Sequence, residues 1–110
     1  MAQNPLDQLY EALDGCETLA FLHLTTRTVL LKNEATPESQ DALNALCVEA
    51  ALVLKDGPVG LLANSDRLTL FLKSNTLPSD ALCCVCAKDT DVERFLALGQ
   101  TCLAELGGVG

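Results

Sequence analysis

Three runs of almost continuously apolar residues constrain the fold of this chain more than any other feature. They lie at residues 19–24, 61–63 and 82–87. A strand with one face in water alternates apolar and polar residues, whereas a continuously apolar strand is typical of a sheet that is buried on both faces. We therefore expect a β-sheet with helices on both sides.

The rest of the chain predicts the elements around these runs. Apolar residues recur at helical spacing in three segments, and each segment begins with residues that favour a helix N-terminus. The segments between them are apolar or β-branched and are joined by short polar connections, which predict mostly antiparallel strand pairs. In chain order we expect a helix from Asn4-Pro5 to Leu13, strands at 18–25 and 28–32, a helix at 37–54, strands at 59–63, 67–73 and 81–87, and a helix from Thr90-Asp91 to Gly107-Gly108.

This order predicts an α/β (α+β) fold, a three-layer sandwich around a five-stranded, mostly antiparallel sheet. The chain has 110 residues, 49% of them hydrophobic, which is enough for one domain with a buried core. We expect a single domain over residues 1–110, with its core at about 5–106 and a frayed tail at 107–110.

Charge and segment composition exclude several function classes. The net charge of -8 repels phosphate backbones and anionic membranes, so nucleic-acid binding is not expected. Lysines interrupt the long apolar runs, and the N-terminus has an acidic residue but no basic one before its first apolar run. We therefore expect a cytoplasmic protein without membrane insertion.

The helix at 37–54 and the strand Val59–Ala63 after it are too apolar to be covered by this chain alone. The strand carries no charge, and at a sheet edge it would expose unpaired backbone groups. By contrast, Lys32 and Asn33 blunt the strand that we expect at the opposite edge. The helix has two apolar lines, one through Leu43, Leu46, Ala50 and Val53 and one through Ala42, Cys47, Ala51 and Leu54.

One sheet covers only one of these lines. A second copy that packs helix on helix and strand on strand about a two-fold axis would cover the other line and the strand edge. The alternative is that the small residues of the helix only let it lie close to its own sheet. These residues are Ala42, Ala45, Ala50 and Ala51.

The element order and several stretches of sequence resemble the roadblock/LC7 family over residues 5–106. The stretches are LAFLHLTTRTVLLKN, PESQDALNALCVEAALVL, VGLLANSDRLTLFLKS and ALCCVCAKD. The turn of the first hairpin departs from the family pattern, because residues 25–28 contain no glycine. The resemblance implies a profilin-like, non-enzymatic module that dimerises through its second helix and third strand and joins two five-stranded sheets into one. It also implies a platform for small Ras-like GTPases or for signalling and motility assemblies.

Carried over to this chain, the resemblance implies the residues of two contact surfaces. Glu38, Asp41 and Glu49 would lie near the helical face of the dimer and steer a basic partner, although solvation alone also explains these charges. The dimer contact would comprise Leu43, Leu46, Cys47, Ala50 and Val53 on the helix and Val59, Leu61, Leu62 and Ala63 on the strand.

The sequence carries no signature of an enzyme or of a metal centre. Neither GxxxxGK[ST] nor GxGxxG occurs, so no glycine-rich loop is present to hold nucleotide phosphates. Cys83, Cys84 and Cys86 form a dense cluster, but strand alternation puts only Cys84 and Cys86 on one face. His23 would complete a Cys2His set without a fourth ligand. We expect reduced, buried thiols, no cofactor, no metal and no catalytic residue.

Two other classes of protein stay open at this point. An acidic, dimeric secretion-type chaperone is also small and α/β, but it would place three strands before the long helix, where this chain has two. A thiol or metal protein would use Cys83, Cys84 and Cys86.

Overall fold

The computed structural model describes residues 5–33, 38–64, 66–75 and 77–107. Its helices and strands follow one another in the predicted order, with two strands before the second helix, unlike the arrangement expected of a secretion-type chaperone. The elements are α1 (Pro5–Ala12), β1 (Cys16–His23), β2 (Thr28–Lys32), α2 (Gln40–Val53), β3 (Val59–Ala63), β4 (Arg67–Lys73), β5 (Asp80–Ala87) and α3 (Val92–Gly107).

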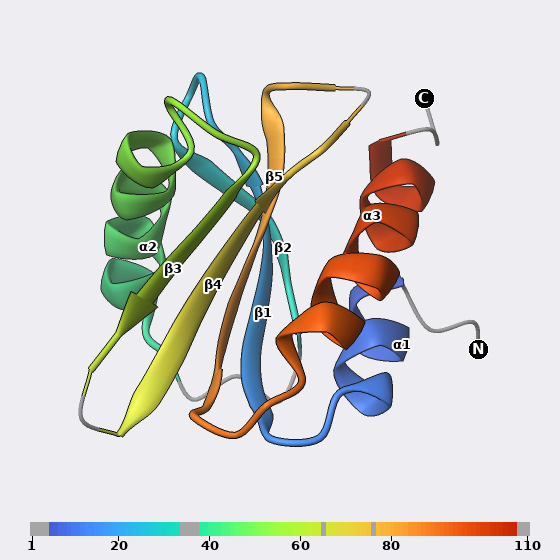
Figure 1. The fold of residues 1–110 in the computed structure, drawn as a ribbon. Coiled ribbons are helices and arrows are strands. Elements are labelled where there is room, and N and C mark those ends of the chain that lie inside the picture. Colours follow the sequence, from blue (N-terminus) through green and yellow to red (C-terminus); the bar gives the residue numbers. More distant parts are fainter. Residues whose placement is uncertain (1–4, 34–37, 65, 76, 108–110) are drawn as a thin grey trace.

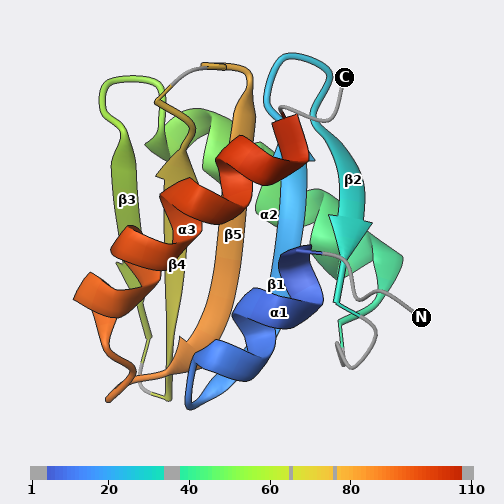
Figure 2. The ribbon, with the colours of Figure 1, turned by 90° about the vertical axis from the view of Figure 1, so that its right-hand side faces the viewer.

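The strands form one sheet in the order β2-β1-β5-β4-β3, and every neighbouring pair is antiparallel. Helix α2 covers one face of this sheet, and α1 and α3 cover the other (Figure 1). Figure 2 shows α1 and α3 side by side over the sheet, with α3 crossing the strands obliquely. The predicted three-layer α+β sandwich is thereby confirmed.

The sheet separates two hydrophobic cores. Leu19, Leu70 and Leu82 pack on the side of α1 and α3, whereas Leu22 and Phe71 pack on the side of α2. Successive residues of a strand alternate between the two faces, so the central strands β1, β5 and β4 supply both cores. Of the three apolar runs, those in β1 and β5 are buried as expected, whereas the run in β3 stays exposed.

The turns and helix ends explain where the elements begin and stop. Gly15 adopts a φ of +83° between α1 and β1, a conformation that glycine tolerates without steric cost. In the β1–β2 turn Arg27 adopts a φ of 55°, the left-handed conformation that a glycine would favour. Helix α2 begins at Gln40, later than predicted, because the Ser39 Oγ accepts a hydrogen bond from the Ala42 N–H at 3.2 Å. The predicted first residue of this helix, Pro37, lies outside the described residues.

Strand β2 lies at the edge of the sheet, as predicted. The Asn33 side chain, however, does not point outward to discourage pairing with another strand. It is buried and points back to β1, where Oδ1 accepts a hydrogen bond from the Leu19 N–H at 2.9 Å. Nδ2 donates to the Glu17 carbonyl at 3.2 Å. Asn33 therefore extends the β1–β2 ladder beyond Lys32.

No helix in the described part of the chain has the length and hydropathy needed to cross a bilayer.

Candidate functional site

Helix α2 turns one line of residues toward its own sheet. Leu43, Cys47 and Ala50 are at most 1% exposed and pack against Leu22 and Phe71 of the sheet. Their spacing of four and three residues places them on one side of a helix. These three residues of the predicted dimer contact are thus buried against their own sheet, and their part in a contact with a second copy stays a prediction.

A second apolar line of α2 stays accessible beside the first. Leu46 and Val53 are half-buried at the rim of the core, and Leu52 is 68% exposed. Ala45 is exposed and precedes Leu52 by two helical turns, which puts both on one side of the helix. We call Ala42, Ala45, Leu46, Leu52 and Val53 the α2 flank.

Leu52 was not predicted as a contact residue, because the sequence does not distinguish which apolar line of the helix faces the sheet. Once Leu43, Cys47 and Ala50 are known to point inward, the spacing from Ala45 to Leu52 identifies an outward line. Val48, one helical turn before Leu52 on α2, is 45% exposed.

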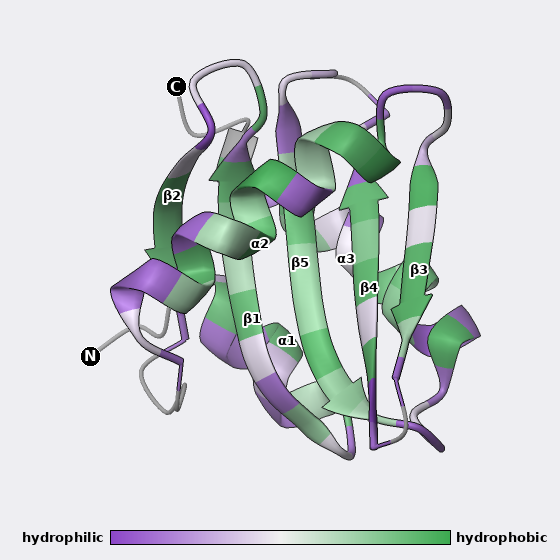
Figure 3. Ribbon diagram, turned by 90° about the vertical axis from the view of Figure 1, so that its left-hand side faces the viewer, coloured by the Kyte–Doolittle hydropathy of each residue, from purple (hydrophilic) through white to green (hydrophobic). Residues whose placement is uncertain are grey.

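Strand β3 is an apolar edge strand, and within the described residues it pairs only with β4. Val59 and Leu61 are 45% and 49% exposed, and their partners on β4 belong to the core under α1 and α3. Leu62 pairs with Thr69, lies on the α2 face of the sheet and is 39% exposed. Figure 3 shows α2 crossing the middle of the sheet and leaving the apolar strand β3 largely uncovered. The strand thus offers apolar side chains and unpaired backbone groups together.

A groove lies between α2 and the strands β4 and β5 of the sheet. Its volume is about 300 Å³, and its lining includes Leu46 and Glu49 from α2 and Arg67, Thr69 and Val85 from the sheet. Gly60 on β3 lies against the last turn of α2, since a Cβ there would lie 1.8 Å from the Val53 Cγ1. We call the α2 flank, this groove and Val59–Ala63 together the α2–β3 surface.

The three acidic residues predicted to steer a partner lie in different surroundings. The Glu38 carboxylate lies 3.7 Å from the Arg67 Nη1, and the Arg67 Nε lies 3.2 Å from the Glu17 carboxylate. Glu38 and Glu49 line the groove. Asp41 is exposed in the first turn of α2, where its charge favours the positive end of the helix. Glu49 and Asp41 are therefore the more accessible of the three.

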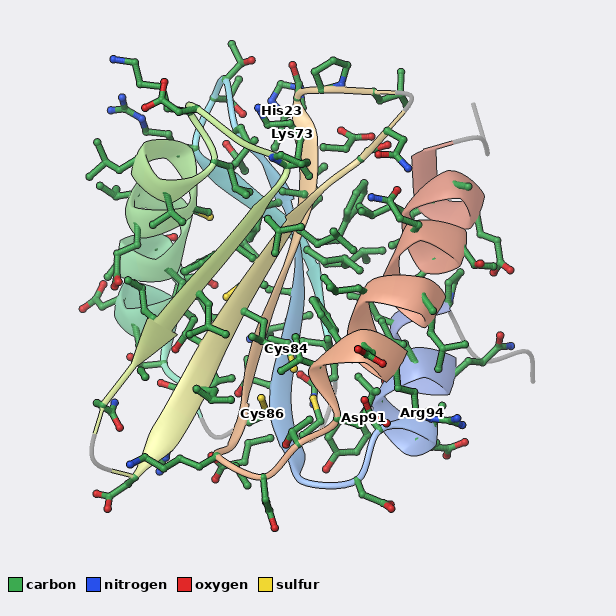
Figure 4. All side chains as sticks on the ribbon, in the orientation of Figure 1. His23, Lys73, Cys84, Cys86, Asp91 and Arg94 are labelled. Atoms are coloured by element: carbon green, nitrogen blue, oxygen red, sulfur yellow. The ribbon has the colours of Figure 1, made fainter. Side chains whose placement is uncertain are left out.

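The cysteines divide between the two cores as strand alternation predicts. Cys84 and Cys86 lie in the core under α1 and α3, whereas Cys83 lies in the core under α2. Strands β1 and β5 are neighbours, but His23 pairs with Asp80 at the end of β1 far from Cys84 and Cys86 (Figure 4). His23, Cys84 and Cys86 therefore do not form a Cys2His set. Among the described residues, no group of three or more His, Cys, Asp or Glu side chains is arranged to hold a metal ion.

A third thiol, which was not predicted from the sequence, lies beside Cys84 and Cys86. Cys16 opens β1 opposite Cys86, and its Sγ lies 3.3 Å from the Cys84 Sγ. A hydrogen bond with Cys84, helped by one with Thr90, lowers the pKa of the Cys86 thiol to about 7. Hydrogen bonds with Cys16 and Cys86 raise the pKa of Cys84. Only the register of β1 against β5 brings these sulfur atoms together, and no local pattern reveals that register.

The arrangement of elements is shared with solved structures at very low sequence identity. A roadblock/LC7 domain from Streptomyces avermitilis gives a TM-score of 0.78 at 8% identity, over 94% of this chain and 92% of that chain. MglB from Myxococcus xanthus gives 0.74 at 8% identity, over 96% and 90%. MglC from the same organism gives 0.64 at 10% identity, over 94% of each chain. No protein-family model and no curated protein sequence matches the chain. The chain therefore has a roadblock/LC7-like fold.

Proposed function

We propose that this chain is a non-enzymatic, homodimeric scaffold or regulatory adaptor in the cytoplasm. Its partner would be a small Ras-like GTPase or a signalling or motility complex. The α2–β3 surface is the single observation that carries this proposal. The roadblock/LC7-like fold supports it, because the resemblance noted in the sequence implies dimerisation through the same two elements. The free state of all six cysteines agrees with a reducing compartment.

A second copy would cover the α2–β3 surface about a two-fold axis. Its β3 would pair with the free edge of β3, and its α2 would lie over the groove beside Leu46 and Leu62. Removing the exposed half of Val59, Leu61 and Leu62 from water would contribute roughly 1 kcal/mol for each side chain. New backbone hydrogen bonds between the strands would add to this.

The partner part of the proposal rests on charge. The chain carries a net charge of -8, and Asp41 and Glu49 are exposed on α2 beside the surface that would join two copies. A dimer would bring two such helices together and so double the local negative charge. This arrangement would steer a partner with a basic patch.

Two leucines on opposite edges of the sheet provide a matched test of the dimer. Leu62 on β3 and Leu31 on β2 are both 39% exposed. We expect Leu62→Lys to turn a dimer into a folded monomer, because it places a charge in the contact, and Leu31→Lys to leave the dimer intact. Light scattering gives the mass of each variant, and circular dichroism checks that each is folded. A dimer that resists Leu62→Lys but is lost with Leu31→Lys would place the contact on the wrong edge.

A binding experiment tests the partner separately. Ras-like GTPases from the source organism, loaded with GDP or with a non-hydrolysable GTP analogue, would be titrated into the full chain by calorimetry. We expect binding that differs between the two nucleotides and weakens several-fold in the Asp41→Lys variant. If no GTPase binds while the chain is dimeric, the GTPase part of the proposal is wrong and the dimer stands.

A further inference from the structure

Three thiols from two neighbouring strands lie together at one end of the sheet. Cys84 and Cys86 project from β5 into the core under α1 and α3, and Cys16 projects from the start of β1 into the same core. The register of the β1–β5 pair shifts between Cys16 and Thr18, so Cys16 opposes Cys86 and yet brings its Sγ to 3.3 Å from the Cys84 Sγ. Figure 4 shows the Cys84 and Cys86 side chains at this end of the sheet, with Asp91 and Arg94 nearby.

We propose that Cys16 and Cys84 are a peroxide-sensitive pair of thiols that closes to a disulfide between β1 and β5. A disulfide needs its two sulfur atoms at about 2.05 Å. The two Sγ atoms lie 3.3 Å apart, in direct contact, so bond formation brings them roughly 1 Å closer. The proposal does not depend on the proposed function.

Access decides which sulfur reacts first. Cys16 is 9% exposed, whereas Cys84 and Cys86 are fully buried. The residues just before Cys16, Asp14 and Gly15, line an open cavity with a volume of about 590 Å³. Hydrogen peroxide is small and uncharged, and Cys16, which alone of the three keeps some exposure, is the first that it can reach.

The reaction balances with hydrogen peroxide as the oxidant. The Cys16 sulfur attacks one peroxide oxygen, the O–O bond breaks, and Cys16 becomes a sulfenic acid with release of one water. The Cys84 sulfur then attacks the Cys16 sulfur, the S–O bond breaks, and the hydroxyl leaves as a second water with the thiol proton of Cys84. Two thiols lose one electron each, and one peroxide is reduced to two waters.

Cys86 fits the role of the group that accepts the proton of Cys84. It is hydrogen-bonded to Cys84, and this bond lowers its pKa to about 7, so a large fraction of Cys86 is thiolate at neutral pH. The pKa of Cys84 is raised, so it needs a base close by to become a nucleophile. Cys86 therefore takes the proton of Cys84 and passes it to the leaving hydroxyl, which departs as water, so Cys86 is not consumed.

Peptide mapping of the full chain tests the proposal directly. The protein is treated with hydrogen peroxide, the remaining thiols are alkylated under denaturing conditions, and the peptides are identified by mass spectrometry. We expect two of the six thiols to be lost, with Cys16 and Cys84 joined and the four others alkylated. Cys102 on α3 is the internal control, because its exposure of 5% is close to the 9% of Cys16, while burial raises its pKa to about 12.

Two variants separate the roles of the three thiols. In Cys84→Ser the sulfenic acid of Cys16 should persist and react with dimedone, since the second thiol is missing. In Cys86→Ser the disulfide should still form, but several-fold more slowly at pH 7, and its rate should recover at higher pH. Circular dichroism checks that each variant is folded.

Several results would overturn the proposal, and the unmodified chain alone can give them. These are the retention of all six thiols, a disulfide mapped to another pair such as Cys16 and Cys86, or oxidation of Cys102 at the same rate as Cys16. A Cys86→Ser variant with unchanged rates would exclude Cys86 as the proton acceptor.

Discussion

The buried side chain of Asn33 hydrogen-bonds to β1 at the edge of the sheet. The Leu19 N–H donates to the Asn33 Oδ1 at 2.9 Å, and the Asn33 N–H donates to the Leu19 carbonyl at 3.0 Å. The amide side chain thus replaces a backbone partner for β1 where β2 ends. A buried N–H without a partner is costly, so this position should tolerate few other residues.

Asn33→Ala should lower the free energy of unfolding by about 2 kcal/mol, because it leaves the Leu19 N–H buried and unpaired. Urea denaturation measures this change. Asn44 on α2 is a matched control, since it is exposed and only accepts a hydrogen bond from the Gln40 Nε2 at 3.0 Å. Asn44→Ala should change stability by no more than about 0.5 kcal/mol. Equal effects of the two substitutions would contradict this role for Asn33.

The buried thiol of Cys102 should make the protein sensitive to alkali. Burial and the nearby Glu105 carboxylate raise its pKa from 9.0 to about 12 in the folded chain. Below pH 9 both states keep the proton and the stability is fully present. Between pH 9 and 12 only the unfolded state loses it, so stability falls by up to roughly 1.4 kcal/mol for each pH unit.

Cys102→Ala removes this contribution while leaving the other buried thiols in place. Its free energy of unfolding should be lower at pH 7, because a buried side chain is shortened, but should fall less steeply above pH 9. Urea denaturation at a series of pH values measures both slopes. Parallel curves for the two proteins would show that Cys102 ionises alike in the folded and unfolded states.

At the scale of elements, the contact between α2 and β3 depends on a glycine, Gly60, which has no side chain. Gly60 on β3 faces the last turn of α2, and a Cβ there would lie 1.8 Å from the Val53 Cγ1 and 3.2 Å from the Val53 Cβ. Val53 is β-branched and stiff in a helix, so it cannot easily move aside. The glycine therefore sets how closely α2 approaches the edge strand, and with it the shape of the α2–β3 surface.

Gly60→Ala should destabilise the fold by about 2 kcal/mol through this overlap. Gly57→Ala is the control, because nothing lies within 4 Å of a Cβ at that position. Thermal unfolding measures both variants at one protein concentration. In a Val53→Ala background the cost of Gly60→Ala should shrink to well under half; an unchanged cost would mean that the overlap with Val53 is not its cause.

Much of the element pattern could be predicted because it depends on neighbouring residues. The bounds of Thr28–Lys32, Val59–Ala63 and Arg67–Lys73 agree with the prediction, since polar turns flank each strand. Strand β1 begins two residues earlier than predicted, at Cys16, because pairing with Cys86 across the sheet extends it. Register of this kind depends on residues far apart in the chain and leaves no local pattern.

The candidate site could be predicted only in part for a related reason. The sequence showed that α2 has more apolar surface than one sheet covers, and the exposure of Leu46, Leu52 and Val53 agrees with this. It could not show that Leu43, Cys47 and Ala50 are the inward line, because both lines have helical spacing and similar hydropathy. Only packing against the sheet distinguishes them.

At the scale of the whole molecule, the sheet has two edges of unequal character. Strand β2 carries Lys32, and the shift in its register against β1 leaves Leu30 as an extra residue, a bulge that discourages further pairing. Strand β3 has a regular register with β4 from Val59 to Ala63 and no charged residue. A second strand can therefore add to the β3 edge more readily than to the β2 edge.

Hydrogen exchange of the backbone amides at several protein concentrations tests this account most directly. If two copies join through β3, the outward N–H groups of Val59–Ala63 exchange slowly in concentrated samples and faster on dilution, while those of β2 exchange at the same rate throughout. Exchange in β3 that is fast and independent of concentration, in a chain that stays monomeric, would contradict the account.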